Sequence, residues 1–417
     1  RIGLDPSFVI YDTSDQLSLV KQAIEALNLS DKQYRPRSML NLISRAKTNL
    51  LRPADFEART YREEVAGRIY ARYQALLSEN NALDFDDLLM RVVFAFREDG
   101  ELLTKYQRRY RHILVDEFQD TNEVQYELVR QMSGHYRSLF VVGDEDQSIY
   151  AFRGANFQNV LRFERDYPDT LKILLERNYR STQTILDVAN AVISPNTQRT
   201  PKTLFTRRAK GAAPVVHEAY DENQEGRWVV EQIQRLVELG IAPGQCAVMY
   251  RINAQSRAIE DAFLAEGIPY KLVGATRFYA RREIKDLIAY LRIVHNPLDT
   301  VSLMRVINVP SRKIGNKSQA GLVDWAAANG GPIYEAFRGL AGAGDAPLAG
   351  MRISAMGRNA LLRFYELWQA WIALREQVSV HELLDDVIEK SGFESYLRDG
   401  SEEGEERWEN VLELRAV

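Results

Sequence analysis

The 417-residue sequence predicts an α/β protein, in which two parallel-sheet parts are accompanied by two mainly helical parts. Apolar residues make up 45% and charged residues 27% of the chain, as in an ordinary globular protein. From residue 111 onward, short β-prone runs alternate with polar loops and helical runs, which is typical of a parallel sheet. Before residue 111 and after residue 283, apolar residues recur at helical spacing instead.

The first helical part covers residues 1–110. Asp15 can cap the helical run that follows it, and Pro36 precedes a second run. Asp84 or Asp86 is expected to begin the last long helix of this part.

The first sheet part covers residues 111–176, where HILVDEF, SLFVVGDEDQS and TLKILLERNYRS predict three strands. A stretch rich in Pro, Gly and basic residues at 194–214 predicts an exposed connection. The second sheet part covers residues 177–283, with strands expected in APVVHEAY, QCAVMYR and YKLVG and a helix at 223–239. Residues 284–417 are expected to be helical.

Composition excludes several classes of protein. The single Cys246 cannot form an internal disulfide or a cysteine zinc site, and such usage fits a reducing cytoplasm. No run of about 18 apolar residues predicts a membrane span, and the first residues do not resemble a signal peptide. The net charge of −4 gives no sign of a nucleic-acid partner, although a local basic groove would be compatible with it.

The sequence LVDEFQDTN places two carboxylates directly after a predicted strand. Ligands bind at the carboxyl ends of parallel strands, so one of the two carboxylates, Asp116 and Glu117, can hold Mg²⁺, and its neighbour can orient or deprotonate a water that attacks a γ-phosphate. Two solvated acids are the alternative interpretation. Asp120 and Thr121 are candidates for the cap of the next helix.

The sequence VVGDEDQSIYAFRGAN repeats this arrangement one predicted strand later. The Gln147 amide can contact both a phosphate and a water. Tyr150, Phe152 and Arg153 can form a platform on which bases stack, or the two aromatic residues can belong to the core.

A third candidate motif is LLERNYRST at residues 174–182. Tyr179 can stack on a purine ring, and Arg180 can reach a γ-phosphate. A solvated surface arginine is the alternative.

The order and spacing of these motifs resemble the UvrD/PcrA/Rep family of superfamily 1 DNA helicases. LVDEFQDTN is similar to the family's Walker B motif, VVGDEDQSIYAFRGA to motif III and LERNYRST to motif IV. The resemblance extends to LDFDDLL, AVMYRINAQSR, FYARREIKDLIAYLR, INVPSRKIG and ERWENVLEL, and so to essentially the whole chain.

The resemblance implies two RecA-like motor domains, both incomplete here, each with a helical insert. Residues 1–110 would be the first insert, 111–176 part of the first motor, 177–283 the first part of the second motor, and 284–417 the second insert. It also implies an ATP-dependent 3′→5′ helicase that moves on single-stranded DNA and unwinds duplexes in repair or replication. Partners would be single strands and single-strand/duplex junctions, with a dimer or a repair protein as further partners, in the bacterial cytoplasm at the nucleoid.

The resemblance also implies roles for individual residues. In the ATP site, Asp116 would bind Mg²⁺, Glu117 would be the catalytic base, Gln147 the γ-phosphate sensor, Arg180 the arginine finger and Tyr179 the adenine-stacking residue. In the DNA site, Phe152 stands where the family usually has tryptophan, and backbone N–H groups of the turn Ser311–Gly315 would hold duplex phosphates. The DNA-contacting residues would be Phe85, Tyr150, Phe152, Arg153, Arg251, Asn253, Arg312, Lys313 and Gly315.

The family's phosphate-binding loop, GxxxxGK[ST], does not occur in the 417 residues, and neither do the family's motifs V and VI. The chain alone is therefore not expected to hydrolyse ATP. An internal portion of a complete helicase is the favoured explanation, because the acids, the sensor and the finger are present. A DNA-binding paralogue without ATP turnover and a helicase–nuclease subunit are the alternatives.

Overall fold

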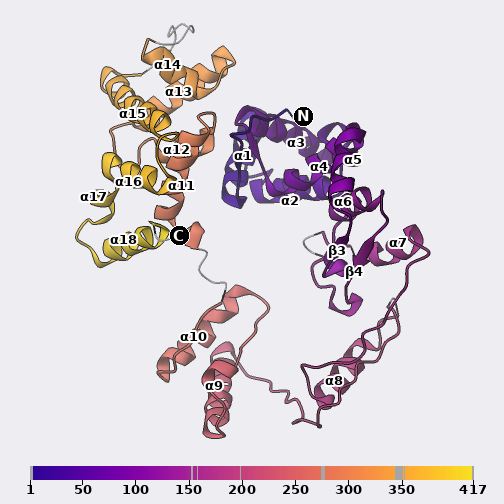
Figure 1. Ribbon diagram of the computed structural model, residues 1–417. Helices are drawn as coiled ribbons and strands as arrows, with labels where there is room; N and C mark the ends of the chain where they lie inside the picture. Colours follow the sequence, from indigo (N-terminus) through magenta and orange to yellow (C-terminus); the bar gives the residue numbers. More distant parts are fainter. Residues whose placement is uncertain are drawn as a thin grey trace. The chain divides into compact units, whose positions relative to one another are not determined.

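The computed structural model describes residues 3–151, 154–156, 158–197, 199–273, 278–342, 351 and 353–415. These residues are mostly helical, with two small two-stranded parallel sheets (Figure 1). The chain divides into two compact units. The first contains the chain up to Leu171 and again from Arg281, and the second is Lys172–Ala280.

The first helical part begins with a capping box. The N-cap of the first helix is Asp12, and the side chain of Asp15, at the third helical position, accepts the Asp12 N–H in return. The expectation that Asp15 is the N-cap was therefore wrong, because the helix begins three residues earlier. Of the two candidates for the later helix, Asp84 is the N-cap. The elements of this part are β1 (Val9–Ile10), α1 (Thr13–Ala26), α2 (Pro36–Thr48), α3 (Tyr61–Glu79), β2 (Ala82–Leu83), α4 (Phe85–Glu98) and α5 (Gly100–Arg109).

Two short parallel strands follow, β3 (Ile113–Val115) and β4 (Leu139–Val141), with Val115 opposite Val141. The helix between them is α6 (Glu123–Ser133), and α7 (Gln158–Asp166) comes after β4. The N-cap of α6 is Asn122, not Asp120 or Thr121, because its side chain accepts the Gln125 N–H within a capping box. Phe118, Tyr126 and Phe163 form the core of this part.

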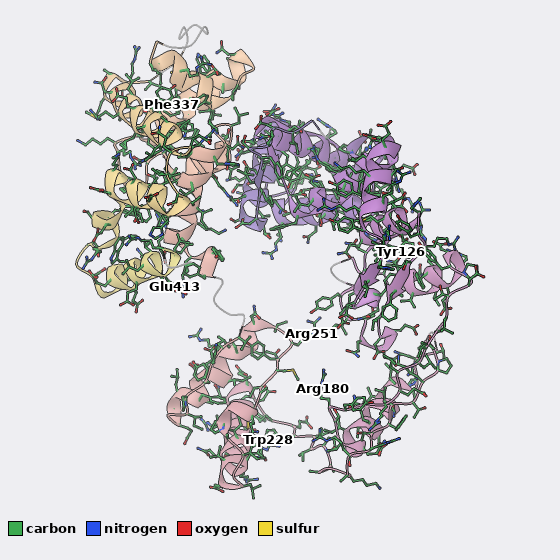
Figure 2. All side chains as sticks on the ribbon, viewed as in Figure 1. Tyr126, Arg180, Trp228, Arg251, Phe337 and Glu413 are labelled. Carbon is green, nitrogen blue, oxygen red and sulfur yellow. The ribbon has the colours of Figure 1, made fainter. Side chains whose placement is uncertain are left out.

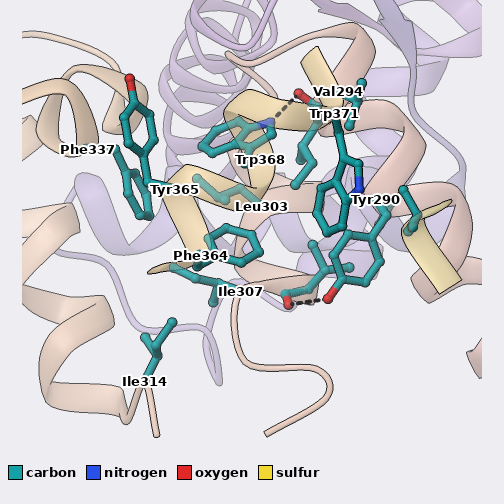
Figure 3. Packing of buried hydrophobic residues seen from close by; sticks show 14 of the residues in the cluster. Tyr290, Val294, Leu303, Ile307, Ile314, Phe337, Phe364, Tyr365, Trp368 and Trp371 are labelled. Carbon is teal, nitrogen blue, oxygen red and sulfur yellow. Dashed lines mark hydrogen bonds between the residues drawn. The ribbon is translucent and has the colours of Figure 1, made fainter. Parts of the chain in front are cut away.

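The C-terminal helices enclose the largest apolar core, which contains two fully buried tryptophans (Figure 3). Trp368 Nε1 donates to the Ile293 carbonyl at 2.9 Å, and the ring of Trp371 lies edge-on to Tyr290 at 5.6 Å. Burying such rings is strongly stabilising once their polar atoms are paired. The helices are α11 (Arg282–His295), α12 (Thr300–Val306), α13 (Asn316–Asn329), α14 (Ile333–Leu340), α15 (Ala355–Leu374), α16 (Val380–Ser391), α17 (Phe393–Leu397) and α18 (Glu402–Arg415).

Within the first unit, the two helical parts meet although they are distant in sequence. The buried Tyr11 hydroxyl donates to Asp299 at 2.6 Å, and Arg292 pairs with Asp15 at 2.7 Å. Asn296 donates to the Asn80 carbonyl at 2.8 Å. These paired polar groups join residues that are 216 to 288 positions apart in the sequence.

The second unit contains α8 (Gln183–Ile193), α9 (Glu222–Glu238) and α10 (Ser256–Ala265). Val230, Ile233 and Phe263 form a small buried apolar cluster between α9 and α10, and Leu186 is buried on α8. The expected helix at 223–239 is confirmed to within one residue at each end.

The strands expected after β4 are not formed in the described residues, which is a correction. TLKILLERNYRS contributes only an isolated bridge between Arg177 and Phe205, and APVVHEAY, QCAVMYR and the described part of YKLVG have no strand pairing. Val216 is 97% and Met249 93% exposed. A strand needs a hydrogen-bonded neighbour, and the described chain places none beside these stretches.

None of the described helices combines the length and apolar character needed to cross a membrane.

Candidate functional site

The strands β3 and β4 lie side by side (Figure 1). The two acids of LVDEFQDTN follow directly at the carboxyl end of β3, beside the end of β4. Both side chains are exposed. Glu117 has φ 48°, in the left-handed region that a residue with a side chain seldom occupies, and its N–H bonds Asp116 Oδ1 at 2.9 Å. Such a strained backbone is found preferentially at functional sites. The local fold therefore presents two carboxylates to solvent at a strand end.

Gln119 links the loops that follow the two strands. Its Nε2 donates to Glu117 Oε2 at 2.8 Å, and its Oε1 accepts the Asp144 N–H at 2.9 Å. The side chain is buried. A Cβ at Gly143 would lie 2.7 Å from Gln119 Oε1, so glycine is needed there for this close approach. Sequence reasoning quoted Gln119 within its motif and gave it no role, because only the register of β3 on β4 places it between the loops.

Gln147 follows β4 on the same edge of the sheet. Its Nε2 donates to Asp144 Oδ2 at 2.7 Å, and its side chain is exposed. The structure therefore brings Asp116, Glu117 and Gln147 to one strand edge through Gln119 and Asp144. Tyr150 is partly exposed in the loop that follows. Phe152 and Arg153 lie outside the described residues.

Phe85 is the first residue of α4, and the residue is 56% exposed. The helix start beneath it is held by Lys47, whose fully buried Nζ pairs with Asp84 at 2.7 Å and with Asp87 at 2.9 Å. Tyr73 also donates to Asp84, at 2.9 Å. Phe85 is thus an exposed aromatic residue on a rigid, ion-paired base.

Burial raises the pKa values of several acidic groups in this cluster. Desolvation raises the pKa of Asp86 to about 6, and it also raises the pKa of Asp87 despite the neighbouring Lys47. Desolvation together with the Asp84 carboxylate holds the pKa of Tyr73 far above its usual range. The charged form of Asp86 is therefore disfavoured in the folded chain.

In the second unit, Tyr179 and Arg180 precede α8, and Arg180 is labelled in Figure 2. Tyr179 is 72% exposed, with the Arg177 guanidinium 4.6 Å from its ring centre. The Asn178 side chain accepts the Arg180 N–H at 2.9 Å and so fixes this turn. Both candidate side chains are accessible to a ligand.

Arg251 and Asn253 lie in the turn before α10. Gln255 Oε1 accepts the Arg251 N–H at 3.0 Å, and both Arg251 and Asn253 are exposed. Arg251 is labelled in Figure 2. Tyr179, Arg180, Arg251 and Asn253 are the predicted site residues that belong to the second unit.

The predicted duplex-contacting turn lies between α12 and α13. The Arg312 guanidinium points into the fold and donates to three carbonyls, those of Val306, Val309 and Pro310, at 2.9–3.1 Å. Lys313 is exposed with φ 64°, and Gly315 is the N-cap of α13. Arg312 therefore supports the turn from inside, and Lys313 is the cation on its outer side.

The residues at the β3–β4 edge suit a magnesium ion bound mainly through phosphate. Mg²⁺ prefers oxygen ligands, and it is commonly held by one or two carboxylates plus phosphate oxygens. Asp116 and Glu117 provide two exposed carboxylates, and Asp120 Oδ1 is buried beside them without a hydrogen-bond partner in the described chain. Among the described residues no group of three or more His, Cys, Asp or Glu could hold a metal by itself.

Comparison with known proteins assigns the family. Residues 1–168 match the UvrD/REP helicase N-terminal domain, and residues 173–334 match the UvrD-like helicase C-terminal domain. The chain belongs to the UvrD/REP helicase family.

The matched relatives are named as helicases. The chain is 41% identical over 420 residues to the ATP-dependent DNA helicase PcrA of Staphylococcus aureus, covering all of this chain and 56% of that protein. It is 40% identical to PcrA of Staphylococcus epidermidis, with the same coverage. The chain therefore spans about half the length of the curated relatives that it matches.

Proposed function

We propose that the protein to which this chain belongs is an ATP-dependent DNA helicase that moves 3′→5′ along single-stranded DNA and unwinds duplexes at junctions, in repair or replication. The observation that carries the proposal is the strand edge where Asp116, Glu117 and Gln147 are held together. The family assignment and the relatives' names support the same activity.

At the strand edge, Asp116 would hold Mg²⁺, which supplies charge neutralisation at the phosphates when bound. Glu117 would accept a proton from the attacking water. Its position is set from two sides, by the Asp116 carboxylate on its own N–H and by the Gln119 amide on its side chain. Gln147 would exchange its bond to Asp144 for one to the γ-phosphate, and so report the state of the nucleotide to the following loop.

In the rest of the chain, Tyr179 would stack on adenine and Arg180 would contact the γ-phosphate. Phe85, Tyr150, Phe152 and Arg153 would contact the single strand, together with Arg251 and Asn253. Lys313 and the N–H groups up to Gly315 would hold duplex phosphates, while Arg312 would keep this turn in shape through the carbonyls that it binds. The 417 residues contain no GxxxxGK[ST] loop, so by themselves they would bind DNA without hydrolysing ATP.

The proposal is tested by Glu117→Gln in the protein to which the chain belongs. This change keeps the size of the side chain and its bond to Gln119 but removes the base. We expect DNA-stimulated ATP hydrolysis to fall by about 10²-fold or more, with little change in DNA affinity. Glu101→Gln, which changes an exposed glutamate on α5, is the matched control. ATP hydrolysis near the wild-type rate in Glu117→Gln would show that the base is wrongly assigned.

A further inference from the structure

The last turn of α2 contacts the supports of two candidate DNA-binding segments that belong to different elements. Lys47 and Thr48 are neighbours in this turn, and both are buried. Lys47 Nζ pairs with Asp84 and Asp87 at the start of α4, and this start of α4 presents Phe85. Thr48 instead lies against the loop that follows β4.

The contact between Thr48 and this loop is made at Gly154. A Cβ added to Gly154 would lie 3.6 Å from Thr48 Oγ1 and 3.9 Å from Thr48 Cβ, so the loop backbone runs directly along the threonine side chain. Gly154 has φ 84°, in the left-handed region that favours glycine. The Thr48 hydroxyl donates to the carbonyls of Ser44 and Arg45 at 3.0 and 3.1 Å, which fixes the direction of the side chain. The contact is therefore one of shape, made by an oriented side chain.

Tyr150 belongs to the same loop as Gly154. The Tyr150 carbonyl accepts the Ala155 N–H at 3.3 Å, which brings the two ends of the loop together. The Asn156 N–H then bonds the Thr121 carbonyl at 3.0 Å, which ties the loop to the segment after β3. The loop that carries Tyr150 is thus held at one end beside the two acids and rests on α2 through Gly154.

The turn of α2 is itself rigidly placed. Leu50, two residues beyond the helix, packs against the buried cluster of Met90 on α4 and Val124 on α6. Phe85 and Tyr150 are 56% and 38% exposed, and both are therefore supported from the same turn. Side chains that bind a common ligand need supporting residues that hold them within a fraction of an ångström of the productive geometry. One rigid turn beneath both segments can meet that requirement.

We propose that Thr48 is a positioning residue for the single-strand site, because it sets where the loop with Tyr150 and Phe152 lies relative to Phe85. Thr48 does not contact DNA itself and acts through Gly154. The proposal rests on the proposed function for the DNA contacts of these aromatic residues. It adds to that function the residue that holds the loop in place.

The test is Thr48→Ala in the protein to which the chain belongs, since alanine removes the hydroxyl and the methyl beside Gly154. We expect the affinity for a labelled oligothymidine strand to fall by about 3- to 10-fold, a part of the roughly 5- to 150-fold loss that deleting a stacking ring causes. The DNA concentration that half-maximally stimulates ATP hydrolysis should rise by the same factor, whereas a loss of folded protein would lower the maximal rate instead. A strand that contains 2-aminopurine should be quenched less at saturation, because its base stacks less closely.

Two further variants separate the contact with the loop from the local bonds of a threonine. Thr48→Ser keeps the oxygen nearest to Gly154 and should restore most of the affinity. Thr104 on α5 also donates to the carbonyl four residues before it, that of Gly100 at 2.8 Å, so Thr104→Ala is the matched control. Equal losses of affinity in Thr48→Ala and Thr104→Ala, or wild-type affinity and quenching in Thr48→Ala, would overturn the proposal.

Double-mutant cycles identify the side chains through which Thr48 acts. In a Tyr150→Ala/Phe152→Ala background, Thr48→Ala should weaken single-strand binding by less than about 1.5-fold, because the rings that it positions are gone. In a Phe85→Ala background the full effect should remain, since Phe85 is held by the Lys47 cluster. An effect of equal size in both backgrounds would mean that Thr48 does not act through the loop.

The outcome for Thr48 is distinguishable from that for the proposed function. If wild-type protein binds the single strand, hydrolyses ATP and loses hydrolysis in Glu117→Gln while Thr48→Ala binds as tightly as wild type, only the positioning role is wrong. If wild-type protein binds no single strand, or Tyr150→Ala/Phe152→Ala leaves its affinity unchanged, the proposed DNA contacts are wrong, and the role of Thr48 is wrong with them.

Discussion

At the scale of single residues, Gln119 is the side chain on which the candidate nucleotide site depends most directly. It is buried and uses both ends of its amide, one on Glu117 and one on the Asp144 N–H. Those two partners belong to loops that follow different strands. One amide therefore sets the distance between the proposed base and the loop of the proposed phosphate sensor.

This gives a prediction for Gln119→Leu, which keeps the volume and removes both hydrogen bonds. We expect a loss of about 1–3 kcal/mol in the free energy of unfolding, because Asp144 N–H loses its acceptor, and a fall in DNA-stimulated ATP hydrolysis. Urea denaturation and steady-state hydrolysis measure the two effects. Gln158→Leu, at the exposed start of α7, is the control. Unchanged hydrolysis in Gln119→Leu would mean that the loops are positioned by other contacts.

At the scale of elements, α4 begins on a buried ionic cluster. Lys47 is fully buried between Asp84 and Asp87, and Tyr73 donates to Asp84. Asp84 is also the N-cap of the helix that presents Phe85. The cluster therefore connects α2 and α3 to the first turn of α4.

Lys47→Met is expected to destabilise the first helical part by about 3–5 kcal/mol, because two buried carboxylates would lose their cation. The exposed pair between Arg72 and Glu79 provides the control, since Arg72→Ala should cost no more than about 1 kcal/mol. The first transition in urea denaturation measures both. A small effect of Lys47→Met would mean that water or protonation compensates for the lost charge.

The same cluster predicts a pH dependence. The folded-state pKa of Asp86 is about 6, above its ordinary value of 3.8. The stabilising contribution of protonated Asp86 is therefore complete below about pH 4 and is lost as pH rises through about 6. Relative to Asp86→Asn, the wild-type protein should lose about 1–3 kcal/mol of stability across this range. Denaturation at several pH values checks the difference, and parallel pH profiles for the two proteins would contradict it.

The helices and strands also show how much of the fold can be predicted from the sequence alone. Helical periodicity and capping residues locate α1, α4 and α9 closely, because these signals are local. Strands are different, since β3 and β4 exist through their mutual pairing, and similar apolar runs such as QCAVMYR remain irregular without a neighbour. The same limit applies to sites. Asp116 and Gln147 stand out in their motifs, whereas the linking role of Gln119 and the inward direction of Arg312 follow from tertiary contacts.

At the scale of the whole molecule, the first unit joins residues from both ends of the chain. Tyr11 and Asp299 form a buried hydrogen bond, and desolvation raises the pKa of the Asp299 carboxyl. Arg292 adds an ion pair to Asp15. The two helical parts thus stabilise each other through a few buried polar groups.

Tyr11→Phe removes only the hydroxyl and should destabilise the first unit by about 1–3 kcal/mol, because Asp299 loses a buried donor. Hydrogen exchange should also become faster in α1 and α12 together, as expected when a shared contact is weakened. Tyr61→Phe, at an exposed position, is the control for the chemistry of the change. Faster exchange confined to α1 would show that the contact does not couple the two parts.

The Tyr11–Asp299 pair also affects how the chain is made. The partners are 288 positions apart, and at roughly 5–20 residues per second a ribosome needs about 15–60 s to add that length. Throughout that interval the nascent helices α1–α3 lack Asp299, Arg292 and Asn296 as partners. Helices α1–α3 are therefore exposed without these partners for that interval, and a chaperone would shield them until residues 292–299 are made.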